Sequence, residues 1–177
     1  MKNIDLETDR LIIKRLSLVH LSDEYLSWLN NSLVTTFLEI KEDYTIDMLK
    51  AYIQKHYENE VYIWAIHLKK SNKHIGNIKI DPIYYSLKSA EYGILMGDTN
   101  NWGRGYAKEA SLRIIKYCFD ELELSRITLG VVEDNINAVA LYKTMEFKID
   151  IVIKDSDVYN QKMCNSLRMS LNANDVN

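Results

Sequence analysis

In the first 60 residues, the order of apolar and polar positions predicts one β-strand followed by two helices. Leu11 to Leu16 follows a polar run and is rich in β-forming residues, which predicts a strand. Ser22 precedes two acidic residues and an apolar helical pattern, so we expect it to cap a helix. Apolar residues recur at helical spacing after Thr45 and predict a second helix there.

The middle of the chain has the pattern of strands. Residues 61–68 are rich in β-formers and residues 74–80 partly alternate, so together they predict a hairpin around a short turn. Residues 90–96 predict a further strand. His74 flanks the turn, where we expect it to be exposed, and His67 is expected to be structural.

The rest of the chain alternates helices with strands. A long amphipathic helix is predicted over residues 106–122. It is followed by a strand over 126–132, a short helix over 137–145, and two closing strands over 147–153 and 163–171. The order β-α-α-β-β-β-α-β-α-β-β predicts a mixed α/β sheet with helices on its faces, in a single domain over residues 1–177.

Composition and charge exclude several classes of protein. The net charge is −3 with both signs interspersed, so the basic footprint of a nucleic-acid binder is absent, although a cationic substrate would be tolerated. No apolar run approaches the roughly 18 residues of a membrane helix, and we expect a cytoplasmic protein. The two cysteines lack zinc-like spacing, so no metal is expected, and Cys118 lies in an apolar helical pattern that predicts a buried, inert thiol.

A glycine cluster is the first sign of chemistry. Four of the six glycines fall between positions 93 and 105, and Gly103 and Gly105 lie between a predicted strand and a predicted helix. The first N–H groups of a helix lack partners within it, and glycine lets a phosphate approach them closely. The segment therefore favours a diphosphate site, with a plain tight turn as the alternative. A P-loop motif is absent, and a dinucleotide fingerprint would need glycine or alanine where Lys108 stands.

This segment also resembles a known family. The GNAT acetyltransferases carry the loop [Q/R]-x-x-G-x-[G/A] between a strand and a helix, and Gly105 and Ala107 match its last two fixed positions. Trp102 stands where Gln or Arg is usual. The form Trp-Gly-Arg-Gly-Tyr-Ala-x-Glu-Ala is similar to the subgroup of ribosomal-protein N-terminal acetyltransferases called RimJ and RimL. The resemblance implies the GNAT acyl-CoA N-acyltransferase fold.

Two further blocks agree with this resemblance. The family often shows N-x-x-[AS]-x-x-L-Y-x-x-x-G-F, which is matched here by Asn135, Ala138, Leu141, Tyr142 and Phe147. Glu146 replaces the usual glycine, so that turn is expected to be built differently. The opening run from Glu7 to Leu11 is a third, weaker match, and the resemblance covers nearly the whole chain.

The resemblance implies a set of residues that bind acetyl-CoA as a co-substrate. The backbone at the end of a strand would pair with the pantetheine arm, the glycine loop would hold the pyrophosphate, and an asparagine would touch the cofactor near the arm. In this sequence these positions are Leu95, Met96, Gly97, Gly103, Arg104, Gly105, Tyr106, Ala107, Lys108 and Asn135.

The implied reaction is direct attack of an amine on a thioester. The resemblance implies that Tyr142 is the general acid, whereas a core tyrosine is the alternative. The glutamate that some family members use as a base corresponds to Gly130, so that role does not transfer. Glu91, on an otherwise apolar strand, is our first candidate for a base or an acceptor-orienting group, with Glu133 and Asp134 as alternatives that are expected to be solvated.

The acceptor is expected to be a small-molecule or peptide primary amine. At pH 7 about a tenth of an α-amine is neutral, but only about one part in 2,500 of a lysine side-chain amine. An enzyme that acetylates an α-amine can therefore use a weaker general base than one that acetylates lysine. A protein N-terminus and an amino sugar or its nucleotide both remain open, as do a monomer and a homodimer. The competing hypothesis is a non-catalytic acyl-CoA-binding sensor of the same fold.

Overall fold

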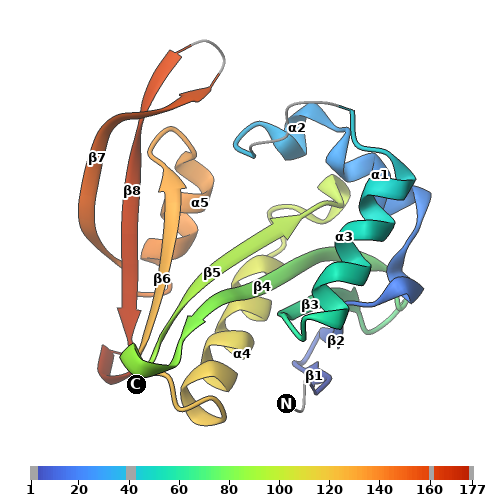
Figure 1. The fold of residues 1–177 in the computed structure, drawn as a ribbon, viewed down its shortest axis with the longest axis horizontal. Helices are drawn as coiled ribbons and strands as arrows, with labels where there is room; N and C mark the ends of the chain where they lie inside the picture. The colour runs from blue at the N-terminus through green and yellow to red at the C-terminus, as the bar shows by residue number, and fades with distance from the viewer. Residues whose placement is uncertain (1–3, 39–42, 160–161, 176–177) are drawn as a thin grey trace. The chain divides into compact units, whose positions relative to one another are not determined.

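The computed structural model describes residues 4–38, 43–159 and 162–175, whose strands and helices are labelled in Figure 1. The strands are β1 Leu6–Glu7, β2 Leu11–Arg15, β3 Tyr62–Leu68, β4 His74–Tyr84, β5 Ser89–Met96, β6 Arg126–Val132, β7 Lys148–Tyr159 and β8 Lys162–Asn172. The helices are α1 Asp23–Leu29, α2 Ser32–Thr35, α3 Ile46–Glu58, α4 Tyr106–Asp120 and α5 Ile136–Lys143. Within the described residues, no helix combines the length and apolar character needed to cross a membrane.

The predicted order of elements is confirmed, with two short additions. β1 has two residues and α2 has four, so neither is long enough to carry a periodic pattern. β4 continues four residues beyond the predicted end at Ile80. The predicted cap at Ser22 is present, since its side chain accepts a hydrogen bond from the Tyr25 amide, and the Thr45 side chain caps α3 by accepting one from the Met48 amide.

The strands form one mixed sheet in the order β1-β2-β3-β4-β5-β6-β8-β7. β5 and β6 are parallel, with Glu91 opposite Thr128, and α4 is the crossover that a parallel pair requires. β8 is antiparallel to both β6 and β7 and lies between them, with Gly130 of β6 opposite Arg168. These two registers bring distant parts of the sequence to neighbouring positions on the sheet.

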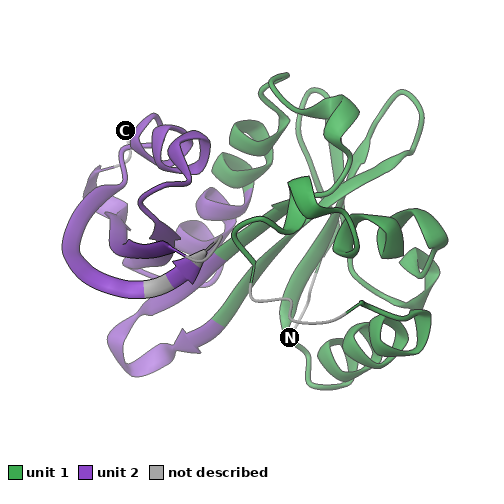
Figure 2. Cartoon of the chain, turned by 90° about the horizontal axis from the view of Figure 1, so that it is seen from above, with its two compact units in different colours: residues 1–81, 93–113 green, residues 82–92, 114–177 purple. Residues whose placement is uncertain are grey.

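The chain divides into two compact units, which are coloured separately in Figure 2. The first comprises residues 1–81 and 93–113, and the second comprises residues 82–92 and 114–177. In the first unit, α1 and α3 bury apolar side chains against β3 and the residue that follows β2. This core consists of Leu16, Tyr25, Trp28, Leu49, Ile53, Ile63 and Ala65.

The second unit has an aromatic core. Tyr92, Tyr142 and Phe147 are all buried, with ring centroids 5.9–6.3 Å apart. Cys118 is fully buried in the same unit, and burial raises the pKa of its thiol to about 12. The prediction of an inert thiol is therefore confirmed, because almost none of it would be thiolate at neutral pH.

One turn of the second unit shows how the chain tolerates a departure from the family pattern. Glu146, where glycine is usual, has φ 65° and so occupies the left-handed region. A side chain in this region costs roughly 1–2 kcal/mol. Glu146 therefore adopts a backbone conformation that favours glycine, which is the residue usual at this position of the family motif.

Three histidines meet in the first unit. The rings of His20, His67 and His74 have centroids 5.1–5.4 Å apart, and His74 also contacts Trp28 at 4.8 Å. The expectation that His74 is exposed is wrong, because α1 covers it through Tyr25 and Trp28. Burial lowers the pKa of His67 to about 4 and that of His74 to about 3, and it also lowers the pKa of His20. All three rings are therefore neutral at pH 7.

This cluster predicts an acid-sensitive fold. Below pH 6.5 the unfolded chain protonates His67 and His74 while these two rings stay neutral in the native protein, so the free energy of unfolding falls as the pH drops from about 6.5 to about 4. Each histidine contributes about 1.4 kcal/mol per pH unit to the slope. The free energy of unfolding of His67→Gln, measured with urea at several pH values, should depend less steeply on pH than that of the wild type, by that amount. An equal slope in the variant and the wild type would contradict the prediction.

Candidate functional site

The end of β5 is fixed by a tryptophan of α1. Trp28 is 4% exposed and packs flat against Gly97, where any Cβ would overlap the indole ring. The amides of Gly97 and Asp98 both donate to the carbonyl of Ile75, at 3.0 and 3.1 Å. The backbone therefore leaves the sheet at a defined point, directly after the residues expected to pair with a pantetheine arm.

A second tryptophan connects the glycine loop to the same strand end. The indole Nε1 of Trp102 donates to the carbonyl of Met96 at 2.8 Å. Trp102 replaces the Gln or Arg that is usual in this loop, and here its ring N–H holds the loop to β5. Leu95 and Met96, which were predicted to contact the cofactor, are half-buried beside it.

Asp98 anchors the start of the connection between β5 and α4. Its carboxylate accepts hydrogen bonds from the Asn100 amide and the Asn101 side chain, at 3.1 and 2.8 Å, and pairs with Lys73 at 2.7 Å. Burial alone would raise the pKa of Asp98, but the hydrogen bonds from Lys73 and Asn101 outweigh it and hold that pKa below its usual value. Sequence reasoning missed this anchor, because Lys73 lies on a different hairpin and gives no local signal.

The glycine loop itself has the backbone that the sequence predicts. Gly103 has φ 71° and Gly105 has φ 79°, a region that residues with a Cβ rarely adopt. The loop is exposed, and α4 begins directly after it at Tyr106. The amides of Tyr106, Ala107 and Lys108 open the helix, where they have no partner within it and carry the positive end of the helix dipole.

These features fit a diphosphate. No atom outside the neighbouring residues lies within 4 Å of a Cβ placed on Gly103, so the loop surface is open there. Arg104 is exposed and Lys108 half-buried, and both could add positive charge. The predicted loop residues Gly103 to Lys108 are therefore brought together on one short segment with its amides available.

In the second unit, Tyr142 lies in the aromatic core on α5. Its side chain is 7% exposed, and burial raises the pKa of its hydroxyl to about 12. The phenol is therefore protonated at neutral pH and is a hydrogen-bond donor. Asn135 is the N-cap of the same helix, where its side-chain oxygen accepts from the Ala138 amide at 3.3 Å. The side-chain oxygen of Asn135 therefore has a structural role as the cap of α5.

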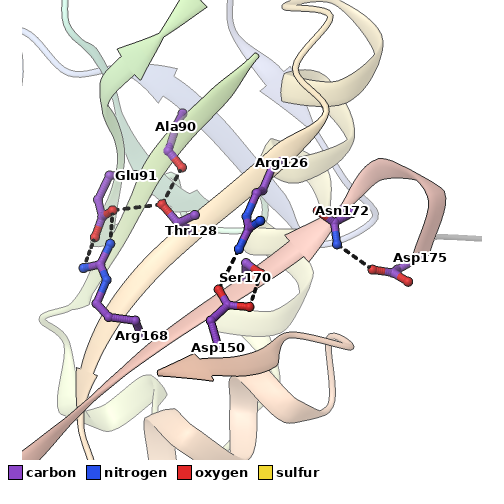
Figure 3. Close-up of polar contacts among 9 residues, drawn as sticks. All are labelled: Ala90, Glu91, Arg126, Thr128, Asp150, Arg168, Ser170, Asn172 and Asp175. Atoms are coloured by element: carbon purple, nitrogen blue, oxygen red, sulfur yellow. Dashed lines mark hydrogen bonds and ion pairs between the residues drawn. The ribbon is translucent and has the colours of Figure 1, made fainter. Parts of the chain in front are cut away.

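Glu91 is gripped by an arginine that sequence reasoning missed (Figure 3). The guanidinium of Arg168 donates to both Glu91 oxygens, at 2.8 and 2.6 Å, and the Thr128 hydroxyl donates to one of them at 2.9 Å. The pair is partly exposed, with 27% of the glutamate and 37% of the arginine side chain accessible.

Gly130 makes room for this ion pair. A Cβ at Gly130 would lie 2.8 Å from Nη1 of Arg168, so with any other residue there the guanidinium would have to shift from its present position. Arg168 alternates along β8 with the buried Leu167 and Met169, which places it on the opposite face of the strand. The alternation in the sequence could therefore predict the face of β8 on which Arg168 lies, but not that Glu91 is its partner.

The alternative carboxylates are at the end of β6, as predicted. Glu133 is exposed and accepts from the Asn165 side chain at 2.7 Å. Asp134 is also exposed and lies 3.5 Å from Lys162 and 3.4 Å from the Cys164 sulfur. Both therefore take part in contacts between the β6–α5 connection and β8. Among the residues that the structure describes, no cluster of three or more His, Cys, Asp or Glu is arranged to hold a metal ion.

Comparison with known proteins identifies a matching family model and chains of similar fold. Residues 10–148 match the family model described as "Acetyltransferase (GNAT) domain". The chain is 25% identical over 170 residues to the uncharacterized N-acetyltransferase p20 of Bacillus licheniformis, with 94% of each chain covered. Among solved structures, it is similar to a spermidine N-acetyltransferase from Vibrio cholerae in complex with CoA and spermine, with TM-score 0.85, 22% identity, and 95% and 98% coverage. A GNAT-family acetyltransferase from Bacillus anthracis aligns with TM-score 0.83, 16% identity, and 96% and 98% coverage.

The contact between Gly97 and Trp28 can be tested by adding one methyl group. We expect Gly97→Ala to lower the free energy of unfolding by about 1–3 kcal/mol, the usual cost of overpacking, because the methyl overlaps the indole. Gly93→Ala, on the strand that ends just before Gly97, is the matched control, since its Cβ would meet nothing within 4 Å, and it should change stability by less than about 0.5 kcal/mol. Equal denaturation midpoints for the two variants would refute the contact.

Proposed function

The chain belongs to the GNAT acetyltransferase family, and from that premise we propose that it acetylates a primary amine of low basicity. It is an acetyl-CoA-dependent N-acetyltransferase. The acceptors that we propose are the N-terminal α-amine of a peptide or protein, as in the RimJ and RimL subgroup, and the amine of an amino sugar. In both, neighbouring electron-withdrawing groups keep the amine less basic than a lysine side chain.

On the cofactor side, we assign the diphosphate to the loop from Gly103 to Lys108. The support is the left-handed conformation of both loop glycines and the set of amides that opens α4. The pantetheine arm would pair with the backbone of Leu95, Met96 and Gly97, and Asn135 would touch the cofactor near that arm. Bound there, acetyl-CoA supplies a thioester whose carbonyl carbon the amine attacks.

Tyr142 is our candidate for stabilising the departing sulfur. An ordinary thiol has a pKa of about 8.5, far below the value of about 12 that burial gives the Tyr142 hydroxyl. Full proton transfer from this phenol to a thiolate is therefore uphill, but a hydrogen bond from it strengthens as negative charge develops on sulfur. We assign Tyr142 the role of that donor.

Glu91 is our candidate on the acceptor side. Both of its oxygens are engaged by Arg168, and one is also engaged by Thr128. Of the two roles considered, proton uptake and orientation of the acceptor, this arrangement favours orientation, because the carboxylate is held in one place and already accepts three hydrogen bonds.

The choice of a weakly basic acceptor rests on one observation, the Glu91–Arg168 ion pair lying over Gly130. Glu91, the first candidate for a base, is paired with an arginine, and the position at which some family members carry a glutamate base is Gly130. An acceptor that is already neutral in part at pH 7 needs no strong base, whereas an alkylamine like those of spermidine does. The likeness to a spermidine acetyltransferase, at 22% identity, supports the fold and not the acceptor.

The acceptor class is tested with a panel of amines assayed by release of free CoA. At pH 7, kcat/KM for a peptide α-amine or an amino sugar should exceed that for spermidine by at least about tenfold. Raising the pH from 7 to 9 should narrow this difference in kcat/KM, because the neutral fraction of an alkylamine rises about a hundredfold over that range, more than that of a less basic amine. A preference for spermidine at pH 7 would overturn the proposed acceptor. Failure of every amine, with CoA still bound, would favour the sensor hypothesis.

The role of Tyr142 is tested by removing its hydroxyl. Tyr142→Phe should lower kcat by about tenfold or more, because a donor to the leaving sulfur is lost, while the affinity for CoA persists. Tyr92→Phe is the matched control, since it removes a hydroxyl from a neighbouring buried tyrosine in the same aromatic core. If both variants kept the wild-type kcat, Tyr142 would be only a core residue.

A further inference from the structure

The turn between β1 and β2 matches the opening motif of the family, yet the proposed chemistry gives it no role. The amide of Thr8 donates to the carbonyl of Leu11, and the amide of Leu11 donates back to the Thr8 hydroxyl oxygen, both at 3.0 Å. The Thr8 hydroxyl proton is then directed to Glu109 Oε1, 2.5 Å away in the first turn of α4. A rigid turn is thus attached to the helix that follows the glycine loop.

Arg10 completes this attachment with its backbone and its side chain. Its amide donates to Glu109 Oε1 at 3.0 Å, and its Nε donates to Glu109 Oε2 at 2.6 Å. The Glu109 side chain is only 18% exposed. The carboxylate therefore holds the guanidinium of Arg10 in one orientation and balances its charge.

The far end of the same guanidinium reaches the glycine loop. Nη1 of Arg10 donates to the carbonyl of Arg104 at 3.0 Å, and the guanidinium carbon lies 4.5 Å from the centre of the Tyr106 ring. A Cβ on Gly105 would be 3.5 Å from Nη2. Arg10 therefore contacts the loop on both sides of Gly105.

The hydrogen bond to Arg104 has a geometric consequence for Gly105. The carbonyl of Arg104 and the amide of Gly105 belong to one planar trans peptide group, so they point in opposite directions. Holding the carbonyl toward Arg10 directs the Gly105 N–H away from it. Glycine loses more conformational freedom than any other residue when it is fixed, and Gly105 is part of this peptide while Gly103 precedes it.

We propose that Arg10 is a positioning residue of the acyl-CoA diphosphate site, which fixes the Arg104–Gly105 peptide so that the Gly105 N–H is aimed at the diphosphate before it binds. The inference rests on the proposed role of the loop. Because Glu109 balances the charge of Arg10, its contribution is to orientation and not to net positive charge. Donors that are already oriented bind their ligand more tightly, since less freedom is lost on binding.

The test compares ligands with and without a diphosphate. Arg10→Lys keeps the charge, but a single ammonium cannot bond Glu109 and the Arg104 carbonyl as the planar fork does. Its Kd for CoA, measured by calorimetry, should rise about tenfold. Its KM for acetyl-CoA should rise similarly with kcat nearly unchanged, whereas kcat/KM for S-acetylpantetheine, which lacks the diphosphate, should stay within about twofold. Thr8→Val, which loses the hydroxyl donor to Glu109, should show the same pattern more weakly.

Arg113→Gln is the matched control. Arg113 lies on α4, outside the loop, and donates to the carbonyl of Glu7 at 3.2 Å, so its loss should not change CoA affinity. Unchanged CoA affinity in Arg10→Lys, or parallel losses for acetyl-CoA and S-acetylpantetheine, would overturn the inference while leaving the loop assignment intact. A wild-type protein that did not bind CoA would overturn the loop assignment and this inference with it.

Discussion

The left-handed backbone at Gly103 and Gly105 is the constraint on which the rest of the site depends. It lets the chain turn from β5 into α4 with no Cβ over the loop, so the amides that open the helix remain accessible. The surrounding contacts hold this turn from several directions. Trp28 packs under its start at Gly97, Trp102 ties it to Met96, and Asp98 anchors the segment between them. Of these three, only Trp28 is remote from the loop in sequence.

The second unit shows how one glycine changes the chemistry open to the site. Gly130 stands where some family members carry a glutamate, and the space it leaves is filled by the guanidinium of Arg168. That guanidinium engages Glu91, the first candidate for a base. The glycine at position 130 and the ion pair between Glu91 and Arg168 therefore belong to one arrangement. The glycine is explained by the space that Arg168 needs, and it does not imply that the protein has lost catalytic activity.

Sequence patterns predicted most of the fold because they report on local geometry. The cap at Ser22, the amphipathic α4 and the glycines before it all act within a few residues of their effects. β1 and α2 were missed because they are too short to carry a period. The RimJ and RimL resemblance and the monomer or homodimer state remain predictions.

The side chains that support the site could not be predicted in this way. Arg168 meets Glu91 across 77 positions and Thr8 meets Glu109 across 101, and their pairing follows from strand register and helix packing. The burial of His74 was missed for the same reason, since it depends on α1 covering a hairpin end. Local patterns place each residue on a face or in a loop, whereas the partner is known only once the sheet is assembled.

The most direct measurement is a titration of the isotopically labelled protein with CoA, followed by NMR at the backbone amides. If the loop binds the diphosphate, CoA should cause the largest chemical-shift changes at the amides from Gly105 to Lys108. Pantetheine, which has no diphosphate, should leave the chemical shifts of those amides unchanged. CoA that binds and leaves the Gly105 amide unshifted would contradict the central claim, as would the absence of any binding.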